Sequence, residues 1–166
     1  MNVALHYAAR LMEAGDLTSL MRRLLVIAYE DIGLGNPQGA ARAVSAVQAA
    51  ERLGLPEARI PLANAIIELA LSPKSNTAIR SIDSALSDVR KGRAISIPDH
   101  LKDAHYSGAQ KLGRGVGYKY PHDYPGHFVK QQYLPNALKN EEYFKAEPTS
   151  SYEDALMKQY QKYRQK

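Results

Sequence analysis

Hydrophobic residues in the first hundred positions recur at spacings of three and four, the period of an α-helix with one buried face. Leu20, Leu24 and Ile32 fall on one such face, while Arg22 and Arg23 fall off it. The same period predicts five helices, over residues 2–14, 17–32, 37–53, about 62–72 and 75–91. No segment alternates convincingly at a period of two. The pattern therefore predicts an all-α fold, a compact bundle of about five core helices joined by short connections.

Residues that favour helix starts and stops bound these segments. Asp16 and Asn36 can cap the second and third helices, because their side-chain oxygens can accept the unpaired amide hydrogens of a first turn. Gly54 and Gly92 stand where the third and fifth helices should end. Pro56 and Pro61 both interrupt the approach to the fourth helix, so the sequence leaves its start open over several residues.

The pattern changes after Pro98. A short helix is predicted over residues 99–112, with Asp99 as its cap, and a long stretch rich in Tyr, Gly, Pro and His follows. Its aromatic content argues against disorder, so we interpret it as an ordered, irregular arm that wraps the helical core. Helical spacing returns over residues 148–166, where Thr149 or Ser150 with Glu153 would form a capping box. The predicted domains are a helical core over 1–98 and a basic, aromatic arm with a final short helix over 99–166.

Charge and tyrosine gather in the second part of the chain. Residues 1–100 hold 11 Lys and Arg against 10 Asp and Glu, and residues 101–166 hold 11 against 7. Nine of the eleven tyrosines follow residue 100. The chain has no cysteine, which excludes disulfides and thiolate metal sites. No apolar run approaches the roughly 18 residues of a membrane span, so we expect a soluble, cytoplasmic protein without membrane contact.

Two acidic residues end the second predicted helix. Adjacent helical residues point about 100° apart, so Glu30 and Asp31 cannot easily share one ligand. Carboxylates also sit unfavourably at the negative end of the helix dipole, which suggests a specific partner such as Lys74 or an arginine. A structural ion pair or loop cap is the favoured interpretation, with acid–base chemistry as the alternative.

Three alternating glycines, Gly113, Gly115 and Gly117, suggest a nucleotide loop at first sight. They lack the Gly-Lys-Ser/Thr ending of a Walker A loop and the strand–helix context of a dinucleotide fingerprint. Backbone geometry, with positive φ or a close approach to a neighbour, explains them better.

The remaining chemistry is sparse. His100, His105, His122 and His127 lie near one another in sequence, but a zinc site needs three or four ligands at matching spacing, so surface or capped histidines are favoured. No Gly-x-Ser-x-Gly elbow or thiol nucleophile is present. We therefore predict no catalytic, cofactor-binding or metal-binding residue in this chain.

Basic and aromatic residues alternate in the arm. Lys111, Arg114 and Lys119 accompany Tyr118 and Tyr120, a combination that can bind single-stranded nucleic acid by charge and stacking. Buried tyrosines with hydrogen-bonded hydroxyls would give the same sequence, so both readings stay open.

Several stretches resemble one ATPase family. They are residues 4–15 (ALHYAARLMEAG), 30–34 (EDIGL), 73–76 (PKSN), 117–123 (GYKYPHD) and 132–135 (QYLP). The chain resembles the C-terminal region of the replication-associated recombination protein A family, also called RarA or MgsA, whose eukaryotic relatives include the Werner-helicase-interacting protein. The resemblance covers residues 2–140 and marks as its structural motif Glu30, Asp31, Lys74, Asn76, Tyr118, Tyr120, His122 and Asp123.

The resemblance implies a non-catalytic role for this segment. Family members are clamp-loader-like, DNA-dependent AAA+ ATPases of stalled replication forks, and ATP and magnesium would belong to an N-terminal module outside these residues. In the family this C-terminal region assembles a homotetramer. We therefore expect an oligomerisation module that also meets its own AAA+ module. The alternatives are a DNA-binding appendage that uses the basic arm and an adaptor for a partner such as single-strand-binding protein.

Overall fold

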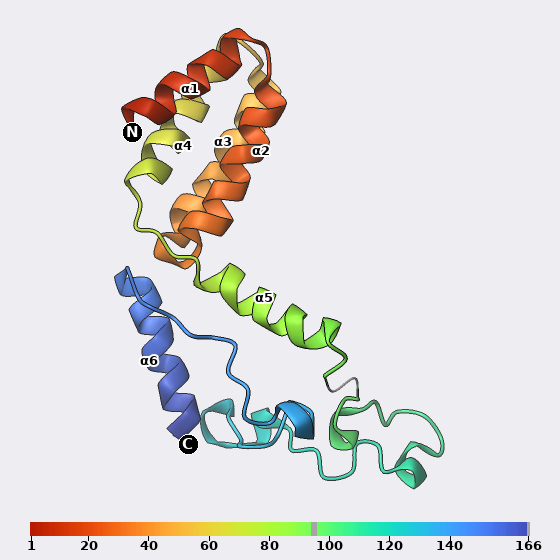
Figure 1. The fold of residues 1–166 in the computed structure, drawn as a ribbon. Helices are drawn as coiled ribbons and strands as arrows, with labels where there is room; N and C mark the ends of the chain where they lie inside the picture. Colours follow the sequence, from red (N-terminus) through yellow and green to blue (C-terminus); the bar gives the residue numbers. More distant parts are fainter. Residues whose placement is uncertain (94–95, 166) are drawn as a thin grey trace. The chain divides into compact units, whose positions relative to one another are not determined.

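Helices form where the spacing of apolar residues predicts them. The computed structural model describes residues 1–93 and 96–165, and that part of the chain contains helices and turns but no strand, which confirms the all-α fold. The helices are α1 (Asn2–Glu13), α2 (Leu17–Ile27), α3 (Pro37–Leu53), α4 (Arg59–Leu71), α5 (Thr77–Arg90) and α6 (Ser151–Gln165) (Figure 1). Across these residues, every helix falls short of the length and apolar character that a membrane span requires.

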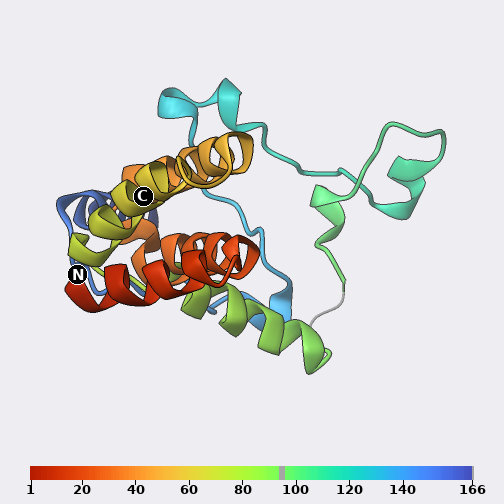
Figure 2. The same cartoon turned by 90° about the horizontal axis from the view of Figure 1, so that it is seen from above.

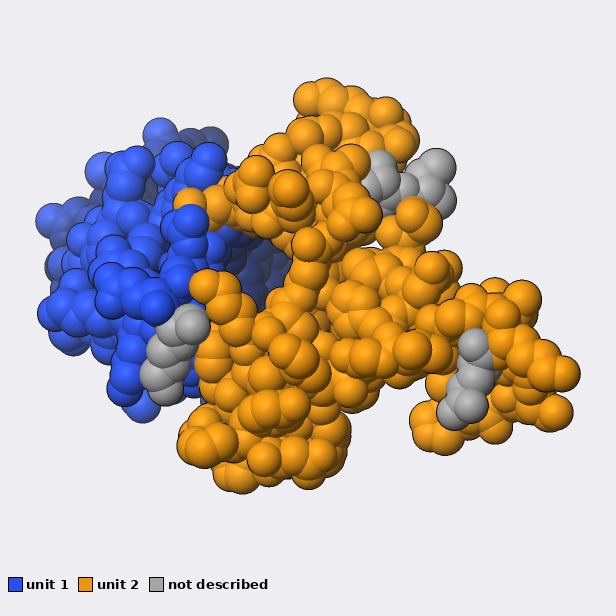
Figure 3. All heavy atoms as spheres, turned by 90° about the horizontal axis from the view of Figure 1, so that it is seen from below, with its two compact units in different colours: residues 1–81, 144–165 blue, residues 82–143, 166 orange. Residues whose placement is uncertain are grey.

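The chain divides into two compact units, coloured separately in Figure 3. The first consists of residues 1–81 and 144–165, and so holds α1 to α4, the start of α5, and α6. The second consists of residues 82–143. The domain boundary expected at residue 98, and an arm that wraps the core, stay predictions.

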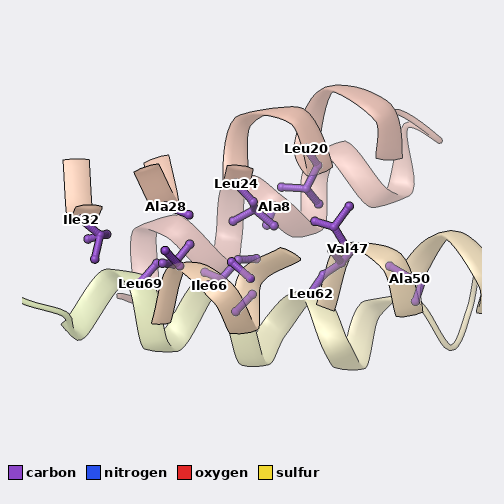
Figure 4. Packing of buried hydrophobic residues seen from close by; sticks show 14 residues of the cluster. Ala8, Leu20, Leu24, Ala28, Ile32, Val47, Ala50, Leu62, Ile66 and Leu69 are labelled. Carbon is purple, nitrogen blue, oxygen red and sulfur yellow. The ribbon is translucent and has the colours of Figure 1, made fainter. Parts of the chain in front are cut away.

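The core lies in the first unit, where α1, α2, α3 and α4 form one bundle (Figures 1 and 2). Ile32 and Leu62 are fully buried, and Leu24, Val47 and Ile66 join them in the cluster of Figure 4. Small side chains bring α3 and α4 close together, because the α3 face that packs inward carries Ala40, Ala43, Val47 and Ala50. Several alanines of α3 are thus buried in the core of the first unit.

Helix boundaries follow local chemistry. The Asp16 side chain accepts a hydrogen bond from the Ser19 amide at 3.1 Å, and Asn36 accepts one from Gly39 at 2.9 Å, as predicted for N-caps. Helix α2 ends earlier than expected, because Ala28–Ile32 forms one wider π-helical turn. Helix α4 begins at Arg59, before Pro61, since a proline in the first turn sacrifices no intrahelical hydrogen bond. Helix α6 confirms the predicted final helix, whose last residue, Lys166, lies outside the described residues.

The helix predicted over residues 99–112 is wrong. The chain forms two separate 3₁₀ turns there, Asp99–Leu101 and Ala109–Leu112. Gly108 between them has φ of +89°, a left-handed conformation that a continuous right-handed helix cannot contain. Asp99 does not cap a helix, because its carboxylate accepts a hydrogen bond from the Lys102 ammonium at 2.5 Å instead.

The second unit is held together by polar contacts more than by a core. Ala109 and Leu138 are its only buried hydrophobic residues among those described. Arg93 joins Asp88 at 2.7 Å and Glu141 at 2.8 Å, and the Tyr143 hydroxyl donates to Asp88 at 3.0 Å. These four side chains, called the clasp below, join the end of α5 to the far end of the irregular segment. The hydrogen bond from Arg93 lowers the pKa of the Asp88 carboxyl, although its burial acts in the opposite direction.

Helix α5 presents an apolar stripe that its unit leaves uncovered. Ile82, Leu86 and Val89 recur at spacings of four and three, and their exposed fractions are 56%, 38% and 70%. The stripe lies at the surface of this chain. An amphipathic helix with an open apolar face favours a further contact.

Candidate functional site at a polar junction and an aromatic loop

Three segments distant in sequence meet in the first unit at a site that we call the junction, formed by residues 31–36, 72–77 and 149–153. The Ser75 amide donates to the Asp31 carbonyl at 2.9 Å, which joins the first two segments. Gly35 allows them to approach, because a Cβ at that position would lie 2.5 Å from the Pro73 carbonyl oxygen. The stretches EDIGL and PKSN, which the sequence marks separately, are therefore neighbours in space.

Asn36 ties the start of α3 to the end of α4. Its side-chain oxygen caps α3, and its amide nitrogen donates to the Ser72 hydroxyl at 2.9 Å. That hydroxyl donates in turn to the Glu68 carbonyl at 2.7 Å. The Asn36 side chain thus hydrogen-bonds to the first turn of α3 and to Ser72 at the end of α4, and so links the two helix ends.

Glu153, in the first turn of α6, is the centre of the junction. Its side chain is fully buried, and its Oε1 accepts hydrogen bonds from Ser75 Oγ at 2.7 Å and Thr77 Oγ1 at 2.5 Å. Its Oε2 accepts from the Thr149 amide at 3.3 Å. Within the described residues it forms no ion pair, so two hydroxyls and one amide solvate this carboxylate.

The pKa of Glu153 reflects this environment. Burial raises the pKa, since it penalises the charged form, whereas the hydrogen bonds from Thr77, Ser75 and Thr149 lower it. The hydrogen bonds together outweigh burial, and the pKa lies below its ordinary value. The carboxylate is therefore ionised at neutral pH and accepts all three hydrogen bonds.

The start of α6 is fixed by neighbouring contacts. The Ser150 hydroxyl accepts from the Glu153 amide at 3.2 Å, which confirms the predicted capping role, and donates to the Leu34 carbonyl at 3.2 Å. The Thr149 hydroxyl donates to the Lys74 carbonyl at 2.5 Å. Helix α6 is thus anchored by its first turn to both of the other segments.

Of the four predicted motif residues of the helical part, Asp31, Lys74 and Asn76 contribute backbone carbonyls, and Lys74 also contributes its ammonium group. The ion pair predicted for Glu30 and Asp31 is wrong for the described residues: both side chains are exposed, and neither forms an ion pair within residues 1–93 and 96–165. Asp31 acts through its carbonyl. The Lys74 ammonium donates to the Leu69 carbonyl at 3.1 Å, beside the Ser72 amide, which donates to the same carbonyl at 3.3 Å at the end of α4. The Asn76 carbonyl accepts the Arg80 amide and begins α5.

The arm glycines are explained by geometry, as predicted. Gly113, Gly115 and Gly117 all have positive φ, between 72° and 82°. At Gly115 a Cβ would also lie 2.5 Å from the Ala104 Cβ. The turn therefore requires glycine, and no phosphate-binding role is needed to explain it.

A second site is the aromatic loop, which we define as residues 119–131. The rings of Tyr120 and His122 have centroids 5.1 Å apart, and those of His122 and His127 have centroids 4.9 Å apart. The Gln131 amide group closes the loop: it accepts from the Lys119 amide at 3.2 Å and donates to the Lys119 carbonyl at 2.7 Å. The Asp123 amide donates to the Tyr120 carbonyl and forms the first turn of the loop.

One of the three predicted basic residues contacts an aromatic ring. The Arg114 guanidinium stands 5.5 Å from the centroid of the Tyr106 ring, a cation–π contact. Lys111 and Lys119 are exposed, as is Tyr118. The readings of Tyr118 and Tyr120 as buried core tyrosines are wrong, since their exposed fractions are 46% and 53%.

The histidines have local partners. His100 Nε2 lies 2.8 Å from the Gln132 carbonyl oxygen, and His105 Nδ1 lies 2.5 Å from the Asp103 carboxylate. Among the residues that the structure describes, no three His, Asp or Glu side chains gather as metal ligands. Sequence reasoning missed the burial of Glu153 and the closing role of Gln131; the capping box was the only signal for the former.

The fold and these two sites define a small helical domain. The family model for the MgsA AAA+ ATPase C terminal region matches residues 1–164, and the chain belongs to that family. The resemblance suggested by the sequence is thereby confirmed.

Named relatives agree with this membership. The chain is 63% identical over 161 residues to replication-associated recombination protein A of Bacillus subtilis, covering 97% of the chain and 38% of that protein. It is 32% identical over 145 residues to the Escherichia coli K12 protein of the same name, covering 86% of the chain and 32% of the relative. It is 30% identical over 145 residues to ATPase WRNIP1 of Dictyostelium discoideum, covering 86% and 17%. The chain thus spans less than two fifths of the length of these relatives.

Proposed function

We propose that this chain is the self-assembly module of a AAA+ ATPase that acts in DNA replication and recombination, and that it performs no catalysis of its own. The observation that carries the proposal is the uncovered stripe of α5, formed by Ile82, Leu86 and Val89. A stripe of this spacing is the surface that a helix normally packs against another helix. A second copy of the chain supplies such a helix, and four copies can close with two-fold interfaces into a tetramer.

An apolar groove in the first unit offers a further contact area for assembly. It has a volume of about 260 Å³ and is lined by α1, α2 and α4, with Tyr7, Leu11 and Ile27 among its side chains. Tyr7 is 56% exposed at its edge. We assign this groove to contact with the AAA+ module of the same protein or with a neighbouring copy.

The chemistry of the whole protein belongs to the other module. In this proposal ATP and magnesium bind to the AAA+ module, and the present chain sets the number and spacing of the ATPase heads by holding several copies together. The assembly works in the cytoplasm, at the nucleoid and the replication fork. The relatives' names, which refer to replication, recombination and ATPase activity, support this proposal.

Sedimentation equilibrium over a range of concentrations tests self-assembly. We expect a homo-oligomer, with a tetramer as the favoured state, and we expect Leu86→Arg to shift it towards the monomer because an arginine in the stripe must be desolvated on contact. Ser84→Arg is the matched control, since Ser84 is exposed on the opposite face of α5. A wild-type chain that is monomeric at tens of micromolar would contradict the proposal.

A second candidate function is nucleic-acid contact through the arm. Residues 102–139 hold six Lys and Arg against two Asp and Glu, and the exposed tyrosines among them favour this role. Binding to single-stranded DNA should weaken with salt and fall when Lys111, Arg114 and Lys119 become alanine. An adaptor role towards single-strand-binding protein is the remaining alternative, and a pull-down with that protein tests it.

A further inference from the structure

We propose that the aromatic loop, residues 119–131, is a stacking platform for the unpaired bases of single-stranded nucleic acid, with the rings of Tyr120, His122 and His127 as its surface. The inference rests on the second candidate function, nucleic-acid contact through the arm, and assigns the base-contacting residues for it. These three side chains are distinct from Lys111, Arg114 and Lys119, which would contact phosphate.

The loop is closed at its neck. Gln131 makes two hydrogen bonds to the backbone of Lys119, at 3.2 and 2.7 Å, and a third to the Tyr133 hydroxyl at 2.9 Å. Compact surface loops whose ends lie close together are frequently functional. The hydrogen bonds between Gln131 and Lys119 hold the two ends of the loop together, so the aromatic side chains of the loop are held at one place on the second unit.

The backbone inside the loop is also restricted. Two short turns, Pro121–Asp123 and Pro125–His127, each begin with a proline, whose φ is fixed by its ring, and Gly126 in the second has φ of +69°. His127 has φ of +52°, and it is the only residue other than glycine with positive φ in the described part of the chain. Such a conformation costs free energy, and residues that keep it cluster at functional sites. Here it brings the His127 ring beside that of His122.

The three rings form a continuous, open row. The ring centroids are 5.1 and 4.9 Å apart, within the range of aromatic contacts. All three side chains are exposed, and Tyr120 is 53% exposed. A ring row that stabilised a core would be covered by the chain itself, whereas these side chains are exposed. Neighbouring rings are tilted by 48° and 53° to one another, so each ring can contact a separate base, and their fixed order lowers the entropic cost of binding.

The positive charge around the loop favours nucleic acid as the ligand. The segment that carries the loop has six basic residues against two acidic ones, and Lys119 and Lys130 flank the ring row as exposed ammonium groups. Bases stack on aromatic side chains while the backbone follows positive charge, which is the usual mode of single-strand binding. A duplex hides its base faces and cannot use the platform.

Fluorescence anisotropy of the 166-residue chain with a labelled thymidine oligonucleotide measures the interaction. Tyr120→Ala combined with His122→Ala should weaken binding roughly 5- to 150-fold, the range for the loss of one stacked base. Tyr120→Phe keeps a stacking ring and should retain the wild-type affinity. Tyr152→Ala is the matched control, since Tyr152 is a 47% exposed tyrosine on α6, outside the loop.

An abasic oligonucleotide of equal length separates stacking from charge. It carries the same phosphates without bases, so the wild-type chain should bind it as weakly as the double variant binds thymidine. The chain has eleven tyrosines and no tryptophan, so stacking on Tyr120 should also quench tyrosine emission directly. Tyr120→Phe should remove part of this quenching while affinity is kept.

Three outcomes would overturn the proposal: equal binding by the double variant and the wild type, equal binding of abasic and thymidine strands, or no binding at all. The same samples in the ultracentrifuge separate this result from the assembly proposal. The loop variants should assemble as the wild type does, so a monomeric chain that still binds the thymidine strand would refute assembly alone.

Discussion

At the scale of single residues, the junction depends on Glu153 and on a glycine. A buried carboxylate without a cation is costly unless hydrogen bonds replace its water, and Ser75, Thr77 and Thr149 supply them. The bonds to Ser75 and Thr77 connect residues 78 and 76 positions apart in sequence. The carboxylate therefore contributes to tertiary structure as much as to the cap of α6.

Glu153→Gln is expected to destabilise the chain by about 1–3 kcal/mol, because a neutral amide replaces a charged acceptor. When its oxygen accepts the two hydroxyls, its NH₂ faces the Thr149 amide, which is itself a donor. Urea unfolding measures the loss. Glu147→Gln is the control, since its side chain is 84% exposed and should change stability by less than about 0.5 kcal/mol. Equal effects of the two variants would refute the structural role of Glu153.

The same variant gives a pH signature. The folded pKa of Glu153 lies below its ordinary value of 4.5, so its stabilisation is present above that value and is lost as the pH falls through the folded pKa. The stability of the wild type should therefore fall more steeply than that of Glu153→Gln as the pH is lowered from about 5. Parallel curves would show that this carboxyl does not contribute.

Gly35→Ala is expected to destabilise the first unit by about 1–3 kcal/mol, because the added methyl group meets the Pro73 carbonyl oxygen at 2.5 Å and the backbone must move. Thermal unfolding followed by circular dichroism measures this. Ser45→Ala, at an exposed position of α3, is the control. An unchanged midpoint for Gly35→Ala would mean that the two segments do not approach closely.

At the scale of elements, local chemistry predicts most of the helices. Asp16, Asn36 and Gly54 mark real boundaries, because capping depends on residues within one turn. The helix predicted over residues 99–112 does not form, because Gly108 has a left-handed conformation that the spacing of apolar residues does not reveal. The contacts of Glu153 with Ser75 and of Gln131 with Lys119 were not predictable, since they depend on how distant segments meet.

The clasp should control the order of the second unit. Arg93→Gln removes the cation shared by Asp88 and Glu141, so we expect faster amide hydrogen exchange in residues 96–140 than in the wild type. Arg90→Gln, at an exposed position at the end of α5, is the control. Identical exchange in both variants would show that the clasp does not hold the segment.

At the scale of the whole molecule, the two units differ in what stabilises them. The first has a continuous apolar core from four helices, whereas the second buries Ala109 and Leu138 as its only hydrophobic residues among those described. Apolar burial is the main favourable contribution to folding, so the second unit has little independent stability.

A peptide of residues 82–143 should therefore be unfolded in isolation. Its amide proton spectrum is expected to show the narrow dispersion of a disordered chain, while the full chain shows a dispersed one. A dispersed spectrum for the isolated peptide would mean that polar contacts such as the clasp suffice. The full chain under the same conditions is the reference.

The position of Glu153 has a consequence for the order of events during translation. Ser75 and Thr77 leave the ribosome well before the carboxylate that accepts their hydroxyl groups, and at about 5–20 residues per second the delay is roughly 4–16 s. During that interval the nascent bundle presents its hydroxyl pair to water or to a chaperone. Helix α6, which follows the other helices of its unit in the sequence, thus completes that unit after they have emerged.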